Sequence, residues 1–335
     1  MCHFSRNTTH SLFDEFRGAE SQNIWQANAE LYREFGKRLI SGGQPTQAFE
    51  VLQEGLLYHN SDPELILLFA TAVARGGNIA RAVKHVDSLL GTADLRVDLQ
   101  VGALILKGSI FKELTGRAGD RQSKIAFASE AARFYEHAYK ISGDTYPAIC
   151  AASMYFVTGD LKRARELAKI VLRQLKSRLR QADSARDCRL FATMAEANLL
   201  LENRSAAQEY YLRAIELAHA GSRIGDIASM RRNVALMHNV GLEIAGDVLG
   251  FLQLGRVVYF TGPKIDRARK GQSATPPMGF SPDQGFEQAV RHVIAENIER
   301  LHATVGFCSG ACGSDLLFAE EMLSRNVRGR VKLGQ

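Results

Sequence analysis

The stretch GGQPTQAFEVLQ, residues 42–53, returns in a similar form as GGNIARAVKHVD, residues 76–87. In each copy the second glycine is followed five residues later by an alanine: Gly43 and Ala48, then Gly77 and Ala82. The two copies lie 34 residues apart. A glycine lets a helix end in a left-handed turn, and an alanine lets the next helix approach its partner closely. The pattern therefore predicts a helix hairpin that repeats.

A period of 34 residues is that of the tetratricopeptide repeat, in which units of two helices stack on one another. The pattern recurs at Gly159 and Ala164, and more loosely in ENRSAAQEYYLRAIELAHA, residues 202–220. We therefore expect four helix hairpins between about 25 and 220.

Two segments depart from this regular spacing. TGRAGDRQSKIA, residues 115–126, is rich in glycine and charge, and it predicts a loop inserted between the second and third hairpins. The stretch that contains ASMRRNVALMHNVG predicts a further helix at about 226–245, which would cap the array.

The sequence changes in character at Arg256. RVVYFTG, residues 256–262, is a β-branched and aromatic run that ends in glycine, which is typical of a buried strand with a turn at its tip. The following segments predict a helix, a strand, a helix and a strand: GFEQAVRHVIAENIERL (285–301), HATVGFCSG (302–310), ACGSDLLFAEEMLSR (311–325) and GRVKLG (329–334). Strands and helices in this alternation form a parallel, doubly wound sheet, here with only three strands.

The predicted fold class is therefore mainly α, with a tetratricopeptide-like helical-repeat solenoid followed by a small, truncated α/β module of Rossmann-like type. We predict an N-terminal extension at 1–24, the repeat domain at 25–250 and the partial module at 256–335.

Composition is that of a globular protein: 335 residues, 46% apolar and 23% charged, with a net charge of +6 and a pI near 9.1. No apolar run is long enough to span a bilayer, and the N-terminus lacks the layout of a secretory signal. The five cysteines are odd in number and scattered, so we expect reduced thiols in a cytoplasmic protein without membrane contact. The basic run KRARELAKIVLRQLKSRLRQ, residues 162–181, predicts a solvated helix face, and without aromatic residues it disfavours nucleic-acid binding.

One turn of the predicted module suggests a binding site. In a parallel sheet the strand tips meet at one edge, which would bring Thr261 and Gly262 close to the turn at 309–313. This turn contains Ser309, Gly310, Ala311, Cys312 and Gly313. Backbone N–H groups at the start of the next helix favour a phosphate, and small residues let it approach.

Two side chains at the start of that helix extend the candidate site. Ser314 could add a hydroxyl donor, and Asp315 could cap the helix or accept a ribose hydroxyl. The alternative is a plain strand-to-helix turn in which Asp315 is an ordinary cap. Cys308 and Cys312 lack the further ligands of a structural zinc site, and the sequence indicates no metal or cofactor.

Two segments resemble known families. SGDTYPAICAASMYFVTGDLKRARELA, residues 142–168, resembles the tetratricopeptide-like TRAF-binding region of the apoptosis signal-regulating kinases, which is also found in many bacterial proteins. RVVYFTGPKID, residues 256–266, together with GFCSGACGSDLLFAEEMLSR, residues 306–325, resembles a Rossmann-like module of the SLOG group, which is thought to sense nucleotide-derived ligands. In this resemblance the ligand site includes two groups of residues: Thr261, Gly262 and Asp266, then Ser309, Ala311, Cys312, Gly313, Asp315 and Glu320.

These patterns suggest a non-enzymatic signalling scaffold whose repeats bind a protein partner in a groove and whose C-terminal module senses a nucleotide-type ligand. One alternative is a pure interaction adaptor without a ligand. A third hypothesis is a nucleotide-cleaving enzyme, for which Asp315 and Glu320 are the candidate carboxylates.

Overall fold

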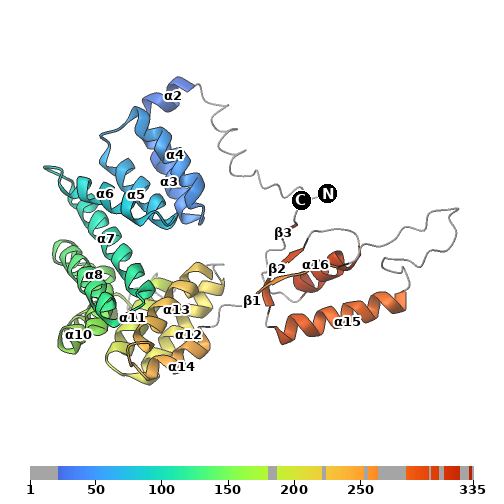
Figure 1. Ribbon diagram of the computed structural model, residues 1–335. Helices are drawn as coiled ribbons and strands as arrows, with labels where there is room; N and C mark the ends of the chain where they lie inside the picture. Colours follow the sequence, from blue (N-terminus) through green and yellow to red (C-terminus); the bar gives the residue numbers. More distant parts are fainter. Residues whose placement is uncertain are drawn as a thin grey trace. The chain divides into compact units, whose positions relative to one another are not determined.

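The computed structural model describes eight segments of the chain: 22–179, 187–220, 224–252, 256–262, 284–301, 303–308, 313–324 and 332–333. The chain divides into two compact units (Figure 1). A helical unit contains the described residues of 22–220 and 229–252. A C-terminal unit contains those from 256 onward, together with the first residues of α13. Asp266 and the turn at 309–312 lie outside the described residues.

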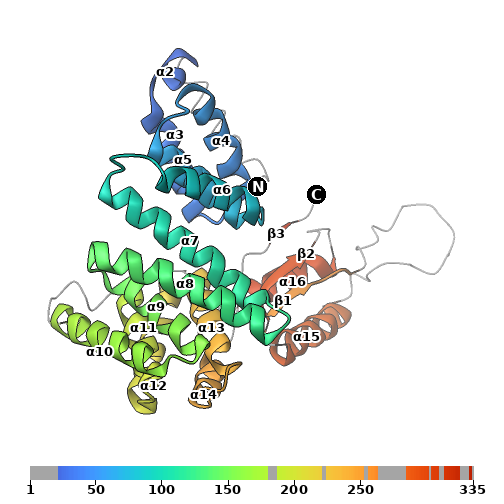
Figure 2. The same cartoon turned by 60° about the vertical axis from the view of Figure 1, so that its left-hand side comes forward.

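The helices between 22 and 251 are, in order, α2 (Gln22–Ala27), α3 (Ala29–Ser41), α4 (Pro45–Tyr58), α5 (Pro63–Arg75), α6 (Ile79–Leu90), α7 (Val97–Arg117), α8 (Arg121–Ser142), α9 (Thr145–Thr158), α10 (Leu161–Arg178), α11 (Cys188–Leu200), α12 (Arg204–Ala220), α13 (Ile224–His238) and α14 (Ile244–Phe251). Each odd-numbered helix from α3 to α11 packs against the helix that follows it, and so forms a hairpin (Figure 2). None of the described helices combines the length and the hydropathy that a bilayer span requires.

Three pairs of first helices from successive hairpins also pack on one another. Helix α3 contacts α5, α5 contacts α7, and α9 contacts α11, whereas α8 connects α7 with α9. We call α3, α5, α7, α9 and α11 the first-helix row. The structure thus confirms a mainly helical, tetratricopeptide-like repeat.

The repeat is visible in the backbone of the turns inside four hairpins. In each, an N–H group bonds to the carbonyl five residues earlier: Gln44 to Leu39 (2.9 Å), Asn78 to Val73 (3.1 Å), Asp160 to Tyr155 (3.0 Å) and Asn203 to Asn198 (2.9 Å). The preceding residue is left-handed in every case: Gly43 (φ 73°), Gly77 (φ 91°), Gly159 (φ 91°) and Glu202 (φ 59°). The predicted hairpin turns are therefore confirmed, with Glu202 in place of the usual glycine.

The expected loop at 115–126 is wrong. Helix α7 continues to Arg117 and α8 begins at Arg121, so these two long helices form a hairpin that the sequence analysis missed. The carboxylate of Asp120 caps α8 by accepting the N–H of Ser123 at 2.8 Å. The five hairpins between 29 and 220 therefore exceed the four expected.

The expected capping helix at 226–245 is also inaccurate, because the chain forms two helices there. Helix α13 ends at His238 and α14 begins at Ile244. Gly241 lies between them with φ of 106°, a conformation that favours glycine and breaks the helix.

The unusual residue at the fourth turn yields a stability prediction. We expect Glu202→Gly to stabilise the protein by about 0.5–1 kcal/mol, because a left-handed residue with a side chain costs roughly 1 kcal/mol. The substitution also removes an exposed ion pair with Arg165, which contributes at most about 1 kcal/mol. Urea unfolding followed by circular dichroism measures the change. The matched variant Glu202→Ala loses the ion pair but keeps the strained backbone, and it should not stabilise; equal stability of the two variants would contradict the explanation.

The C-terminal unit contains β1 (Arg256–Tyr259), α15 (Gln284–Arg300), β2 (Ala303–Cys308), α16 (Ser314–Ser324) and β3 (Lys332–Leu333). The strands are parallel in the order β1-β2-β3, with Tyr259 opposite Phe307 and Phe307 opposite Lys332. The predicted alternation of strands and helices is confirmed for these segments. The Rossmann-like identity of the unit stays a prediction.

One face of this small sheet carries the core. Ile294 and Ile298 of α15 join Phe318 and Met322 of α16 in one buried cluster with Val258 and Phe260 packed against it. On β1, Tyr259 lies between these two inward residues and is 78% exposed, stacked on the ring of Phe307 at 4.9 Å. Both helices thus cover the same face of the sheet. Because α16 follows β2 in a parallel sheet, its first residues lie at the edge where the strands end.

Candidate functional site

The tips of β1 and the start of α16 meet, as the parallel topology predicted. The N–H of Gly262 donates to the Asp315 carboxylate at 3.1 Å. A Cβ atom at Gly262 would lie 1.9 Å from the hydroxyl oxygen of Ser314, so a larger residue here would force the Ser314 side chain to move. Thr261 is exposed beside it. Of the predicted site residues, Thr261, Gly262, Ser314 and Asp315 are therefore brought together, and Gly313 directly precedes α16 with φ of 112°.

The Asp315 carboxylate connects the end of β1 to the start of α16. Its side chain is only 2% exposed, and it joins two segments that are 53 residues apart. The Gly262 amide is consequently already occupied, which removes one of the backbone donors expected at the strand tips.

Glu320 lies away from the strand tips. It is six residues beyond Ser314, or about 9 Å along the helix. Its carboxylate pairs with Arg291 of α15 at 2.7 Å, and Arg291 also bonds Glu287 and Glu321. These contacts raise the pKa of Arg291, with the Glu320 hydrogen bond as the largest cause. Glu320 thus connects α15 with α16.

Removing the Asp315 carboxylate should loosen the β1 tip. We expect Asp315→Ala to destabilise the C-terminal unit by about 1–3 kcal/mol, because the Gly262 N–H loses its acceptor. Hydrogen exchange measured by mass spectrometry should show faster exchange in the peptide that contains 256–262. Asp315→Asn keeps an acceptor oxygen and should have a smaller effect. Unchanged exchange in Asp315→Ala would show that the contact does not hold the strand.

A second polar cluster, which the sequence analysis missed, lies in the helical unit. The Glu196 side chain on α11 is 7% exposed. One of its oxygens accepts the hydroxyl of Ser153 on α9 at 2.5 Å, and the other accepts the amide of Asn233 on α13 at 3.1 Å. Both donors are neutral. In the sequence, the indication of this buried polar cluster is a single carboxylate within the apolar helix CRLFATMAEANLL.

The tyrosines near this cluster form a chain of hydroxyl and thiol groups. The Tyr135 hydroxyl lies 2.9 Å from that of Ser109. Tyr135 and Tyr146 both affect the Cys150 thiol, which lies one turn beyond Tyr146 on α9. Burial raises the pKa of Cys150 to about 11, so this thiol stays protonated at neutral pH. The neighbouring Cys150 and burial raise the pKa of Tyr146. Tyr146 is nevertheless 53% exposed, so much of this residue faces solvent.

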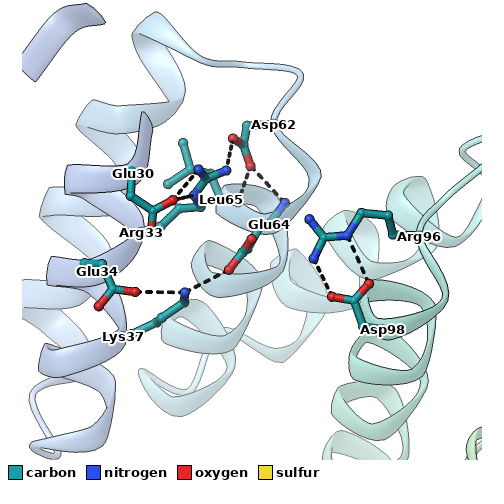
Figure 3. Close-up of polar contacts among 9 residues, drawn as sticks. All are labelled: Glu30, Arg33, Glu34, Lys37, Asp62, Glu64, Leu65, Arg96 and Asp98. Atoms are coloured by element: carbon teal, nitrogen blue, oxygen red, sulfur yellow. Dashed lines mark hydrogen bonds and ion pairs between the residues drawn. The ribbon is translucent and has the colours of Figure 1, made fainter. Parts of the chain in front are cut away.

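An ionic network joins the first two helices of the row. Figure 3 shows Arg33 and Lys37 of α3 reaching toward the start of α5, where they pair with Asp62 at 2.8 Å and Glu64 at 2.9 Å. Asp62 also caps α5 by accepting the N–H groups of Glu64 and Leu65. The hydrogen bond to Glu64 is the largest cause that raises the pKa of Lys37. These charged groups therefore satisfy one another and fix the α3–α5 contact.

Within the described residues, no group of three or more histidine, cysteine or acidic side chains is placed to hold a metal ion.

No protein-family model and no curated protein matches the sequence. Several solved structures resemble the chain in fold. A thermophilic TPR protein of Thermus thermophilus is 16% identical with a TM-score of 0.47, over 63% of this chain and 99% of that one.

Two other solved structures are also similar. A tetratricopeptide repeat protein from Parabacteroides merdae is 12% identical with a TM-score of 0.41, over 73% of this chain and 90% of that one. MamA from Desulfovibrio magneticus is 19% identical with a TM-score of 0.38, over 57% of this chain and 96% of that one. Likeness at this level concerns the helical fold alone and identifies no activity.

Proposed function

We propose that the helical unit is a non-enzymatic scaffold that binds a protein partner along the first-helix row. The observation that carries the proposal is Tyr146 on α9, a large aromatic residue of the first-helix row that is 53% exposed. A tyrosine has only two side-chain torsions and so loses little conformational freedom on binding, and tyrosines are enriched among residues that dominate interface energies. Stacked repeats also offer an extended surface to a partner.

The proposal is tested by capture of proteins from cell extract on the immobilised full-length chain, followed by affinity measurement with the purified partner. We expect Tyr146→Ala to weaken binding by about tenfold or more. Tyr58→Ala is the matched control, because Tyr58 is a similarly exposed tyrosine on the second helix α4. Equal affinity of the two variants would overturn the proposed surface.

A second proposal concerns the C-terminal unit, which we infer to be a Rossmann-like, SLOG-like module that senses a nucleotide-type anion. Support comes from the convergence of Thr261, Gly262, Ser314 and Asp315 at the strand tips. Because Asp315 occupies the Gly262 amide and the N–H groups of Leu316 and Leu317 bond the Gly313 carbonyl, the anion would be received by the exposed Thr261 hydroxyl. With the TRAF-binding-like repeats, this module would make the chain a cytoplasmic signalling scaffold.

Thermal-shift measurements with a panel of nucleotides test the second proposal. A nucleotide should raise the melting temperature of the full-length chain, and Thr261→Val should abolish this shift without lowering the basal melting temperature. If no nucleotide shifts the melting temperature, or if Thr261→Val leaves the shift unchanged, the sensor is rejected and the adaptor without a ligand remains.

A further inference from the structure

Helix α10 carries the largest local excess of positive charge among the described helices. Its sequence LKRARELAKIVLRQLKSR contains seven lysines and arginines and one carboxylate, an excess of six that equals the net charge of +6 of the whole chain. The apolar side chains of this second helix are buried against its neighbours α9 and α11: Ala164, Leu167, Ala168, Val171, Leu172 and Leu175. The cations are therefore not needed to solubilise an exposed apolar surface.

Four of these cations form a row that we call the basic stripe: Lys162, Lys169, Arg173 and Lys176. Each residue advances about 100° around an α-helix, so the four lie within an arc of about 60°, almost opposite the buried side chains. All four are exposed. From Lys162 to Lys176 the stripe extends about 21 Å along the helix.

The stripe is not neutralised by the residues that the structure describes. The other three cations of α10 are engaged. Arg163 pairs with Glu136 and Glu166, Arg165 pairs with Glu202, and Arg178 also has a partner. No side-chain hydrogen bond or ion pair links any stripe residue to another residue in the described segments. Glu166, the one carboxylate of the helix, bonds Arg163 rather than the stripe.

The helix gains little from this arrangement by itself. Like charges at a spacing of three or four residues, such as Lys169, Arg173 and Lys176, repel each other and disfavour the helix. The helix dipole accounts for Lys176 near the C-terminus, but it opposes Lys162 in the first turn. The repulsion among the cations of the basic stripe destabilises the isolated helix, and an anionic partner that covers the stripe would relieve this repulsion.

We propose that the basic stripe of α10 docks an acidic segment of a partner protein, with carboxylates spaced as on one face of a helix. An acidic helix with glutamates at i, i+7, i+11 and i+14 would match the stripe in length and in period. No side chain of α10 is aromatic, so the base stacking that single-stranded nucleic acids use is missing. Because the apolar face of α10 is buried within the repeat, the helix also lacks the apolar face by which surface helices enter a membrane.

The probe for this surface is a fluorescein-labelled helical peptide of about 15 residues with glutamates at those four positions. Its binding to the full-length chain is followed by fluorescence anisotropy at about 50 and 300 mM salt. We expect binding that weakens with salt, and a loss of about tenfold in the triple variant Lys169→Gln, Arg173→Gln, Lys176→Gln.

A matched control removes the same charge elsewhere. The triple variant Arg38→Gln, Lys84→Gln, Arg121→Gln changes three exposed cations on α3, α6 and α8, and it should bind the peptide within about twofold of the unchanged chain. Equal loss in both triple variants would show attraction to net charge only and would overturn the stripe. Binding to a duplex DNA or to phosphatidylserine vesicles, with none to the acidic peptide, would also overturn it.

Discussion

Replacing Gly55 with valine is expected to unfold the first hairpin before the rest of the helical unit. A Cβ atom at Gly55 would lie 2.8 Å from Cγ of Tyr32 and 2.9 Å from its Cβ, so α4 touches the base of this side chain rather than its mobile end. Tyr32 is completely buried and packs edge-on against Trp25 at 5.0 Å. Overpacking at such a contact costs about 2–3 kcal/mol.

Trp25 is the single tryptophan of the chain, so its fluorescence reports on this hairpin alone. In urea, the fluorescence transition of Gly55→Val should move to lower concentration than the circular-dichroism transition, because stacked repeats can unfold locally. Gly116→Val is the matched control: this residue also lies in a helix, but a Cβ atom there meets no other atom within 4 Å. Coincident transitions in Gly55→Val, or the same loss in Gly116→Val, would show that the Tyr32 contact does not limit the hairpin.

The parts of the fold that the sequence predicted were those set by local chemistry. Gly43, Gly77 and Gly159 predicted their turns, since a left-handed residue is easiest for glycine. The fourth turn was less evident because Glu202 adopts the same conformation with a side chain. Conversely, Gly116 suggested a loop, but it lies on the exposed side of α7, where the helix tolerates it.

The candidate sites depended on contacts between distant residues. Parallel topology was sufficient to predict that Gly262 and Ser314 would meet at one edge of the sheet. It was not sufficient to predict that the Asp315 side chain would take the Gly262 amide, since this depends on one side-chain position across 53 residues. The same limit applies to Glu196, whose partners come from two other helices.

Removing the Glu196 carboxylate is expected to separate the repeats of the second half of the row. Glu196→Ala deletes the acceptor of both Ser153 and Asn233, and hydrogen bonds to a charged group contribute about 1.5–3 kcal/mol each. Because two such bonds are lost, we expect a decrease of about 3–6 kcal/mol in the free energy of unfolding, measured by urea unfolding with circular dichroism. Glu209→Ala, an exposed carboxylate on the adjacent α12, should change the stability by less than about 0.5 kcal/mol.

A double-mutant cycle separates the contact from the general cost of an altered core. If the Ser153 hydroxyl acts through Glu196, then Ser153→Ala should cost at least about 1 kcal/mol in the unchanged chain and close to nothing in the Glu196→Ala background. Equal costs in the two backgrounds would show that the hydrogen bond contributes no stability. Tyr146→Ala should reduce partner binding while leaving this coupling intact, because Glu196 accepts its hydrogen bonds from Ser153 and Asn233. The buried network would then fix the spacing of α9 and α11, and the exposed tyrosine ring would provide the contact with the partner.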